Sequence, residues 1–139
     1  MMSYFRAIDT TTSPSASLTI DAFPQHLGVL RALVRTAAAH YPLSLDALTD
    51  LVLAVDEAAS TLINYAAPSS ALTCTFAVDS ERHLRIVLTA TTSRRISNSS
   101  SSFGRIVLRT LVDDVIAEQV PIDGDWLVTI MLRKAVQAG

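Results

Sequence analysis

Residues 45 to about 66 constrain the fold of this chain more than any other stretch, because their apolar residues recur at helical spacing over a long run. The apolar stripe consists of Leu48, Val52, Val55, Ala59, Leu62, Ile63 and Ala66. Apolar residues three and four apart lie on one side of a helix, and that side must be covered by another element. Ser44 precedes the stripe as a predicted N-cap, and Pro68 follows it. We therefore predict one long helix that packs on a second layer.

Five segments are predicted to supply that layer as strands. They are residues 17–22, 72–78, 84–89, 115–121 and 126–133. In the first three, apolar and polar residues alternate, which is typical of a strand that buries one face. Turn-like residues at 79–82 make a hairpin of the second and third strands, and residues 123–125 (Asp-Gly-Asp) turn the chain between the last two.

Two more helices complete the pattern, one over residues 27–41 that Pro42 ends, and a short one over residues 103–111. The order β-α-α-β-β-α-β-β predicts an α+β fold. We expect a two-layer α/β sandwich with three helices on one face of a mixed five-stranded sheet.

The predicted domain covers residues 16–135, and residues 1–15 are predicted to be a flexible N-terminal arm because they are polar and rich in Thr and Ser. Residues 91–102 are mostly Ser, Thr and Arg. Such a stretch offers little to pack, so we predict a mobile surface loop there.

Composition excludes several classes of protein. Half of the residues are hydrophobic and 17% are charged, which is unlike a disordered chain. The net charge of −2 without a basic stripe disfavours nucleic-acid binding. The single cysteine, Cys74, excludes an internal disulfide and a cysteine zinc cluster, and it is expected to be a small buried hydrophobe. No segment has the pattern of a signal peptide or a membrane span, so a cytoplasmic protein is expected.

Three segments carry a resemblance to a known family. Residues 53–66 read LAVDEAASTLINYA and resemble the helix pattern LAVxEAxxNAxxHA. Residues 103–115, FGRIVLRTLVDDV, are similar to the pattern GLGLxLIxxLxDxV, and residues 126–134 resemble the family's last strand. Over residues 18–134 the chain thus resembles bacterial anti-sigma factors that double as serine kinases and have the histidine-kinase-like (GHKL) ATP-binding fold.

The resemblance implies ATP and Mg²⁺ as cofactors and places two site residues on the long helix. Glu57 falls on the general base for the hydroxyl that is phosphorylated, and Thr61 falls on the asparagine that coordinates Mg²⁺. A threonine hydroxyl is shorter than an amide, while Mg²⁺ demands a near-ideal octahedron. Glu57 has an alternative interpretation as a solvated carboxylate beside Asp50 and Asn64.

Further nucleotide positions are substituted. Ala90 falls on the aspartate that accepts the adenine amino group, and Thr92 and Arg94 fall on two glycines that let the backbone approach the nucleotide. Gly104 retains one of two glycines in the phosphate loop. Loss of a buried acceptor weakens binding by about 1–3 kcal/mol.

Two functions remain open from this pattern. The first is an anti-sigma factor that sequesters an alternative sigma factor and is released by an anti-anti-sigma (STAS-type) antagonist, with weak or lost ATP binding. The alternative is an active serine/threonine-protein kinase that phosphorylates this antagonist. A third, weaker hypothesis is a dimerising module with another protein ligand. The resemblance also implies a homodimer that pairs through the first strand and first helix.

Four arginines are candidate partner contacts. Arg31 falls on an arginine that family members use against the sigma factor, and Arg35 lies one turn further along the same helix. The alternative for Arg31 is an exposed charge on an amphipathic helix. Arg94 and Arg95 are expected to pair with phosphate, with an acidic partner, or only with solvent.

Overall fold

The computed structural model describes residues 16–97 and 105–137. Its elements are β1 (Ala16–Asp21), the 3-10 turn η2 (Pro24–His26), α1 (Leu27–Ala38), α2 (Leu45–Asn64), β2 (Ala71–Val78), β3 (His83–Thr92), α3 (Arg105–Leu111), β4 (Asp114–Ile122) and β5 (Asp125–Ala135). The predicted order of helices and strands is confirmed. The predicted arm at residues 1–15, and the predicted helix start at residues 103–104, lie outside the described residues.

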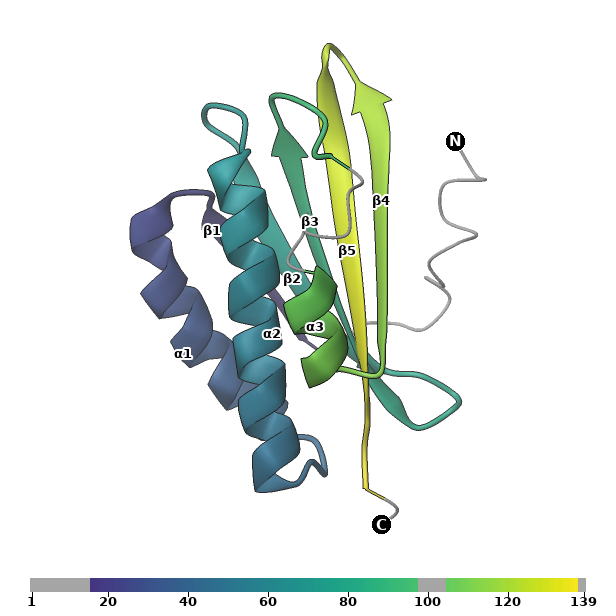
Figure 1. Ribbon diagram of the computed structural model, residues 1–139. Coiled ribbons are helices and arrows are strands. Elements are labelled where there is room, and N and C mark those ends of the chain that lie inside the picture. Colours follow the sequence, from purple (N-terminus) through teal and green to yellow (C-terminus); the bar gives the residue numbers. More distant parts are fainter. Residues whose placement is uncertain (1–15, 98–104, 138–139) are drawn as a thin grey trace.

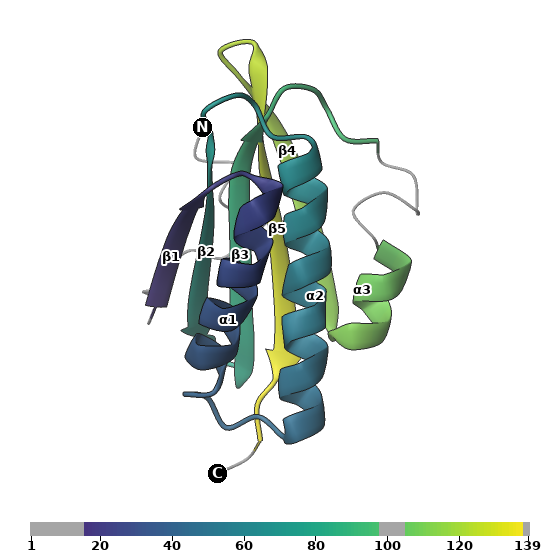
Figure 2. The same ribbon diagram turned by 90° about the vertical axis from the view of Figure 1, so that its left-hand side faces the viewer.

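The three helices cover one face of a five-stranded sheet, as Figures 1 and 2 show, so the predicted α+β sandwich is confirmed. The sheet is not mixed, however. The strand order is β1-β2-β3-β5-β4, and each neighbouring pair is antiparallel. The crossover through α3 carries the chain past one strand position to the sheet edge. The β4–β5 hairpin then returns β5 into the gap beside β3, antiparallel to both neighbours.

Helix α2 organises the helical layer and lies between α1 and α3 (Figure 2). It begins where predicted, because the Ser44 hydroxyl accepts a hydrogen bond from the Ala47 N–H at 3.0 Å. Its buried side packs on the sheet through Leu51, Val52, Ala54, Val55, Ala58, Ala59, Leu62 and Ile63. No helix within the described ranges has the length and apolarity that crossing a membrane requires.

Cys74 lies in β2 on the face that the helices cover, and none of its surface is exposed. Burial raises the pKa of its thiol to about 12. The thiolate is the reactive form of cysteine, so this residue is inert in the folded chain. The expectation of a small buried hydrophobe is confirmed.

The prediction of a mobile loop at residues 91–102 is wrong for its first half. Strand β3 continues to Thr92, and the Ile96 side chain is 1% exposed within the core. The side-chain amide of Gln119 on β4 accepts from the Ile96 N–H at 2.7 Å and donates to the Ile96 carbonyl at 2.8 Å. One isoleucine and one amide thus anchor a stretch whose composition alone indicated no packing; residues 98–102 lie outside the described part.

Candidate functional site

The carboxyl end of α2 and the end of β3 are joined by backbone hydrogen bonds. The Ala67 N–H donates to the Thr91 carbonyl at 2.9 Å, and the Ser93 N–H donates to the Tyr65 carbonyl at 3.0 Å. Thr92 also forms a β-bridge with the residue before Ala67. These contacts bring the residues matched to the family's helix motif next to those matched to its adenine loop.

Glu57 and Thr61 lie on the same side of α2 as Asp50, as the helical spacing of the three residues requires. Glu57 lies about two turns after Asp50, and Thr61 lies about one turn after Glu57. The Asp50 carboxylate lies 3.7 Å from the Lys134 amine, which donates to the carbonyl of Leu111 at the end of α3. Glu57 is half-buried, and the Thr61 hydroxyl donates to the Glu57 backbone carbonyl at 3.2 Å.

The positions matched to the adenine loop are filled by the chain itself. Ala90 is 2% exposed and lies in the middle of the sheet, opposite Leu72 on β2 and Val128 on β5. Thr92 is fully buried, and its hydroxyl donates to the Arg94 carbonyl at 2.9 Å. The methyl group of Ala90 offers no acceptor to an adenine amino group, so this position does not fit the base.

Arg94 places a long side chain where the resemblance implies a glycine. Its guanidinium lies 4.8 Å from the centroid of the Tyr65 ring. The next guanidinium, that of Arg95, lies 5.9 Å from the centroid of the Trp126 ring on β5. Both contacts are within the range of a cation–π interaction. Gly104 lies outside the described residues.

The position matched to the family's Mg²⁺ ligand holds the shorter side chain of Thr61. Residues 16–97 and 105–137 contain no group of three His, Cys, Asp or Glu side chains arranged to hold a metal. The Thr61 hydroxyl donates its proton to the Glu57 backbone carbonyl. Mg²⁺ binds through oxygen ligands in strict octahedral geometry, for which Thr61 is a poor substitute.

Arg31 and Arg35 lie on α1, apart from the Glu57 side of α2. Both the Nε and Nη2 atoms of Arg31 donate to the Asp56 carboxylate, at 3.2 and 2.8 Å. Asp56 lies on the side of α2 that faces α1, and Glu57 is rotated by about 100° from it around the helix. Arg35 is exposed on the following turn of α1. The structure thus pairs Arg31 with a carboxylate of its own chain, which the sequence analysis had not predicted.

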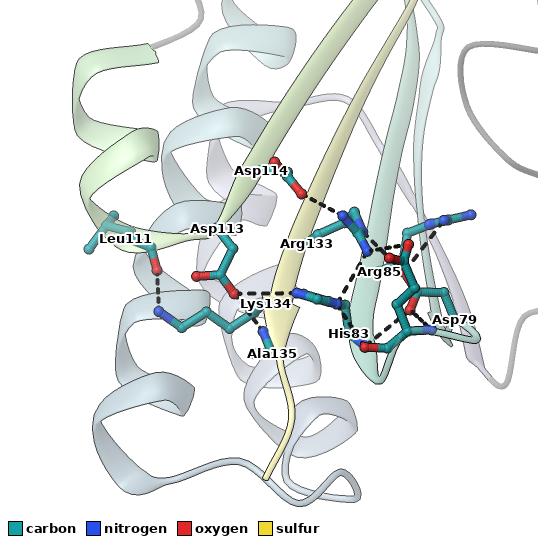
Figure 3. A network of polar contacts seen from close by, with 10 residues as sticks. Asp79, His83, Arg85, Leu111, Asp113, Asp114, Arg133, Lys134 and Ala135 are labelled. Carbon is teal, nitrogen blue, oxygen red and sulfur yellow. Dashed lines mark hydrogen bonds and ion pairs between the residues drawn. The ribbon is translucent and has the colours of Figure 1, made fainter. Parts of the chain in front are cut away.

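Sequence reasoning also missed a polar network centred on Asp79 and Arg133, shown in Figure 3. One Asp79 oxygen accepts from the N–H groups of Glu81 and His83, at 2.9 and 3.1 Å. The other accepts from Arg133 Nε at 3.0 Å and lies 3.5 Å from Arg85. Sequence analysis had assigned residues 79–82 only to a turn.

The network joins β5, the start of β4 and the β2–β3 turn through ion pairs. Arg133 on β5 also donates to Asp114 at the start of β4 and to Glu81 in the β2–β3 turn. Burial by itself raises the pKa of Asp79, but the hydrogen bonds from His83 and Glu81 and the Arg133 guanidinium hold it below its ordinary value. The sequence does contain an indication of this network. Arg85 and Arg133 lie in two strands that are otherwise largely apolar, and a buried arginine requires a carboxylate partner.

Searches of family models and of curated proteins gave no match for this chain. Solved structures do match it in fold. The RsbU and RsbW domains of Rv1364c from Mycobacterium tuberculosis align with 91% of the chain at 17% identity and a TM-score of 0.57. This chain spans only 35% of that longer protein chain.

A second match is a chain of the SiaB–SiaC complex from Pseudomonas aeruginosa. It aligns over 96% of this chain and 98% of its own length, at 11% identity and a TM-score of 0.68. The likeness to both structures is one of fold, and it extends over nearly the whole chain. The expected fold is therefore confirmed over nearly the whole chain.

Proposed function

We propose that this chain is an anti-sigma factor that binds proteins and has weak or lost ATP binding. It sequesters an alternative sigma factor and releases it when an anti-anti-sigma partner competes. The observation that carries the proposal is the contrast between an intact fold and a filled nucleotide position. Ala90 and Thr92 are core residues, and Arg94 lies against Tyr65, where a nucleotide site requires an acceptor and open backbone.

The two matched folds support the class of partner. One belongs to a protein with an RsbW domain, and the other to a complex in which SiaB and SiaC are bound to each other. The chain from the SiaB–SiaC complex matches over 98% of its length, so this fold occurs in a protein that binds another protein. We infer that the same fold binds a protein partner here. Binding of a protein partner depends on the exposed surface of the fold, so it does not require the residues that contact a nucleotide.

A serine/threonine kinase is the second candidate function, and Glu57 favours it. Its carboxylate is half-buried on α2, one turn before Thr61, at the position of the family's general base. This candidate requires ATP to bind, however, and the position of Ala90 opposes that. The affinity for nucleotide therefore separates the two functions.

We expect isothermal titration calorimetry of the full chain with ATP, at millimolar Mg²⁺, to give an affinity weaker than micromolar. The physical reason is that a nucleotide would lack the adenine acceptor at Ala90 and the amide ligand at Thr61, each costing about 1–3 kcal/mol. Glu57→Ala is the matched variant: it should leave sigma-factor binding unchanged. Micromolar or tighter ATP binding, or transfer of phosphate to an antagonist that depends on Glu57, would favour the kinase instead.

A homodimer forms part of this proposal. Among the described strands, β1 is an edge of the sheet and pairs with β2 alone. Beside it, α1 exposes 53% of Val29 and 39% of Leu33. At 3.6 residues per turn these two residues lie on the opposite side of α1 from Arg31, so one helix has room for a second copy and for another partner. An open edge next to apolar side chains is a typical pairing surface.

We expect light scattering to report about twice the chain mass of 14.9 kDa. Val29→Asp should reduce this to one chain mass, because a carboxylate buried in the pairing surface lacks a partner. Leu53→Asp is the matched control, since Leu53 is also 53% exposed but lies on α2, away from β1. A single chain mass for the unaltered protein at high concentration, or equal effects of both substitutions, would contradict pairing through α1.

A further inference from the structure

Two consecutive arginines follow β3, and each lies over an aromatic ring from a different element. Arg94 lies over Tyr65, which caps α2, at 4.8 Å from the ring centroid. Arg95 lies over Trp126 of β5 at 5.9 Å. A guanidinium that is held over a ring by a cation–π contact still has N–H donors available to a ligand.

The backbone that carries these arginines is anchored on both sides. Before them, the Ser93 N–H donates to the Tyr65 carbonyl, and the Thr92 hydroxyl donates to the Arg94 carbonyl. After them, Ile96 is buried and its backbone is held by the two-way hydrogen bond with Gln119. The backbone that carries both arginines is therefore fixed before any ligand arrives, which lowers the entropy cost of binding.

The charge of the two arginines is not neutralised by a carboxylate in the described part of the chain. The ion pairs within residues 16–97 and 105–137 include Arg31, Arg85, Arg133 and Lys134, but neither Arg94 nor Arg95. Both residues are exposed. Two oriented cations of this kind are suited to charge-assisted, bidentate hydrogen bonds.

We propose that Arg94 and Arg95 form a docking site for an acidic segment of a protein partner. Two guanidiniums on consecutive residues, each over its own ring, can each pair with one carboxylate of such a segment. A nucleic acid is disfavoured because the chain has a net charge of −2. Tyr65 lies nine residues after Asp56, about 14 Å along α2, so this surface is distinct from that of Arg31. The site goes beyond the proposed function, because it does not depend on whether ATP binds.

The single tryptophan of the chain provides the readout, since Arg95 lies over its ring. The full chain is titrated with a hexaglutamate peptide at low salt while the fluorescence of Trp126 is followed. We expect a saturable change that Arg94→Gln and Arg95→Gln each weaken by about tenfold, equivalent to about 1.4 kcal/mol. Arg109→Gln is the matched control, because it removes the same charge from an exposed position on α3 and should leave the affinity within about twofold.

Two further arms keep the result interpretable. Arg94→Lys retains the charge but not the fork, so it should bind more weakly than the unaltered chain and more tightly than Arg94→Gln. Inorganic phosphate at equal ionic strength should produce no saturable change. The proposal is overturned if hexaglutamate gives no saturable signal, if Arg109→Gln weakens binding as much as the other variants, or if phosphate reproduces the peptide's effect.

Discussion

Replacing Asp79 by alanine is expected to lower the free energy of unfolding by about 3–5 kcal/mol. The side chain of Asp79 is 6% exposed and lies between those of Arg133 and Arg85, which are 16% and 12% exposed. Without the carboxylate, two largely buried guanidiniums lose their shared partner, and the N–H groups of Glu81 and His83 lose their acceptor. The free energy of unfolding of a typical domain is only about 5–15 kcal/mol, so this substitution is large enough to prevent stable folding.

Urea denaturation followed by circular dichroism measures this effect. Glu81→Ala is the matched control, because Glu81 also pairs with Arg133, at 3.3 Å, but its side chain is 77% exposed. Exposed pairs contribute about 0–1 kcal/mol, so the control should unfold near the same urea concentration as the unaltered chain. Equal losses for the two variants would show that burial does not govern this network.

The same residue gives a pH dependence with a defined sign. The folded-state pKa of Asp79 is lowered, so its contribution to stability is complete above the unfolded-state pKa of about 3.9 and is lost as the pH falls through the folded-state value. The stability difference between the unaltered chain and Asp79→Asn should therefore shrink below about pH 4. A difference that stays constant down to strongly acidic pH contradicts the ionised state of Asp79.

Replacing Arg31 by alanine is expected to weaken sigma-factor binding by about 2 kcal/mol, or about thirtyfold. Arginines that form bidentate bonds to carboxylates concentrate energy at interfaces, and Arg35 adds a second guanidinium one turn away. The fold should survive, because Arg31 and Asp56 are 49% and 30% exposed and such a pair contributes about 0–1 kcal/mol. Surface plasmon resonance measures the affinity for a sigma factor that is first identified by pull-down with the full chain.

Asp56→Ala is the informative comparison for this prediction. In the free chain the Asp56 carboxylate occupies two donor positions of Arg31, at 3.2 and 2.8 Å. Its removal should leave sigma-factor binding equal or tighter, because Arg31 no longer has to exchange partners. Unchanged affinity for Arg31→Ala, with native melting behaviour, places the sigma factor on another surface. Weaker binding by Asp56→Ala means that the ion pair, rather than the free guanidinium, is recognised.

Local patterns in the sequence determined which segments are helices and strands. The stripe from Leu48 to Ala66, together with the Ser44 cap, sufficed to predict α2, since the spacing of apolar residues decides which side of a helix is buried. Alternation likewise identified the β2–β3 hairpin, and Cys74 was correctly predicted to be buried. These features depend on neighbours in the chain, which a sequence displays directly.

The tertiary structure decided the features that depend on residues distant in the chain. Strand directions followed from the position to which α3 delivers β4, so the sheet is antiparallel where a mixed one was expected. The ordered conformation of residues 93–97, which follow β3, depends on the hydrogen bonds between Ile96 and Gln119, 23 residues further along the chain. Its polar composition carries no record of that contact.

The candidate site divides in the same way. The resemblance seen in the sequence predicted substituted motif positions at Thr61, Ala90 and Arg94, because motif positions are local, and this assignment stays a prediction. Only the folded chain pairs Arg31 with Asp56, 25 residues apart, and Arg133 with Asp79, 54 residues apart. Which carboxylate meets which guanidinium depends on strand register and helix packing. Those are properties of the assembled core, so the partners of each charge became known only from the three-dimensional structure.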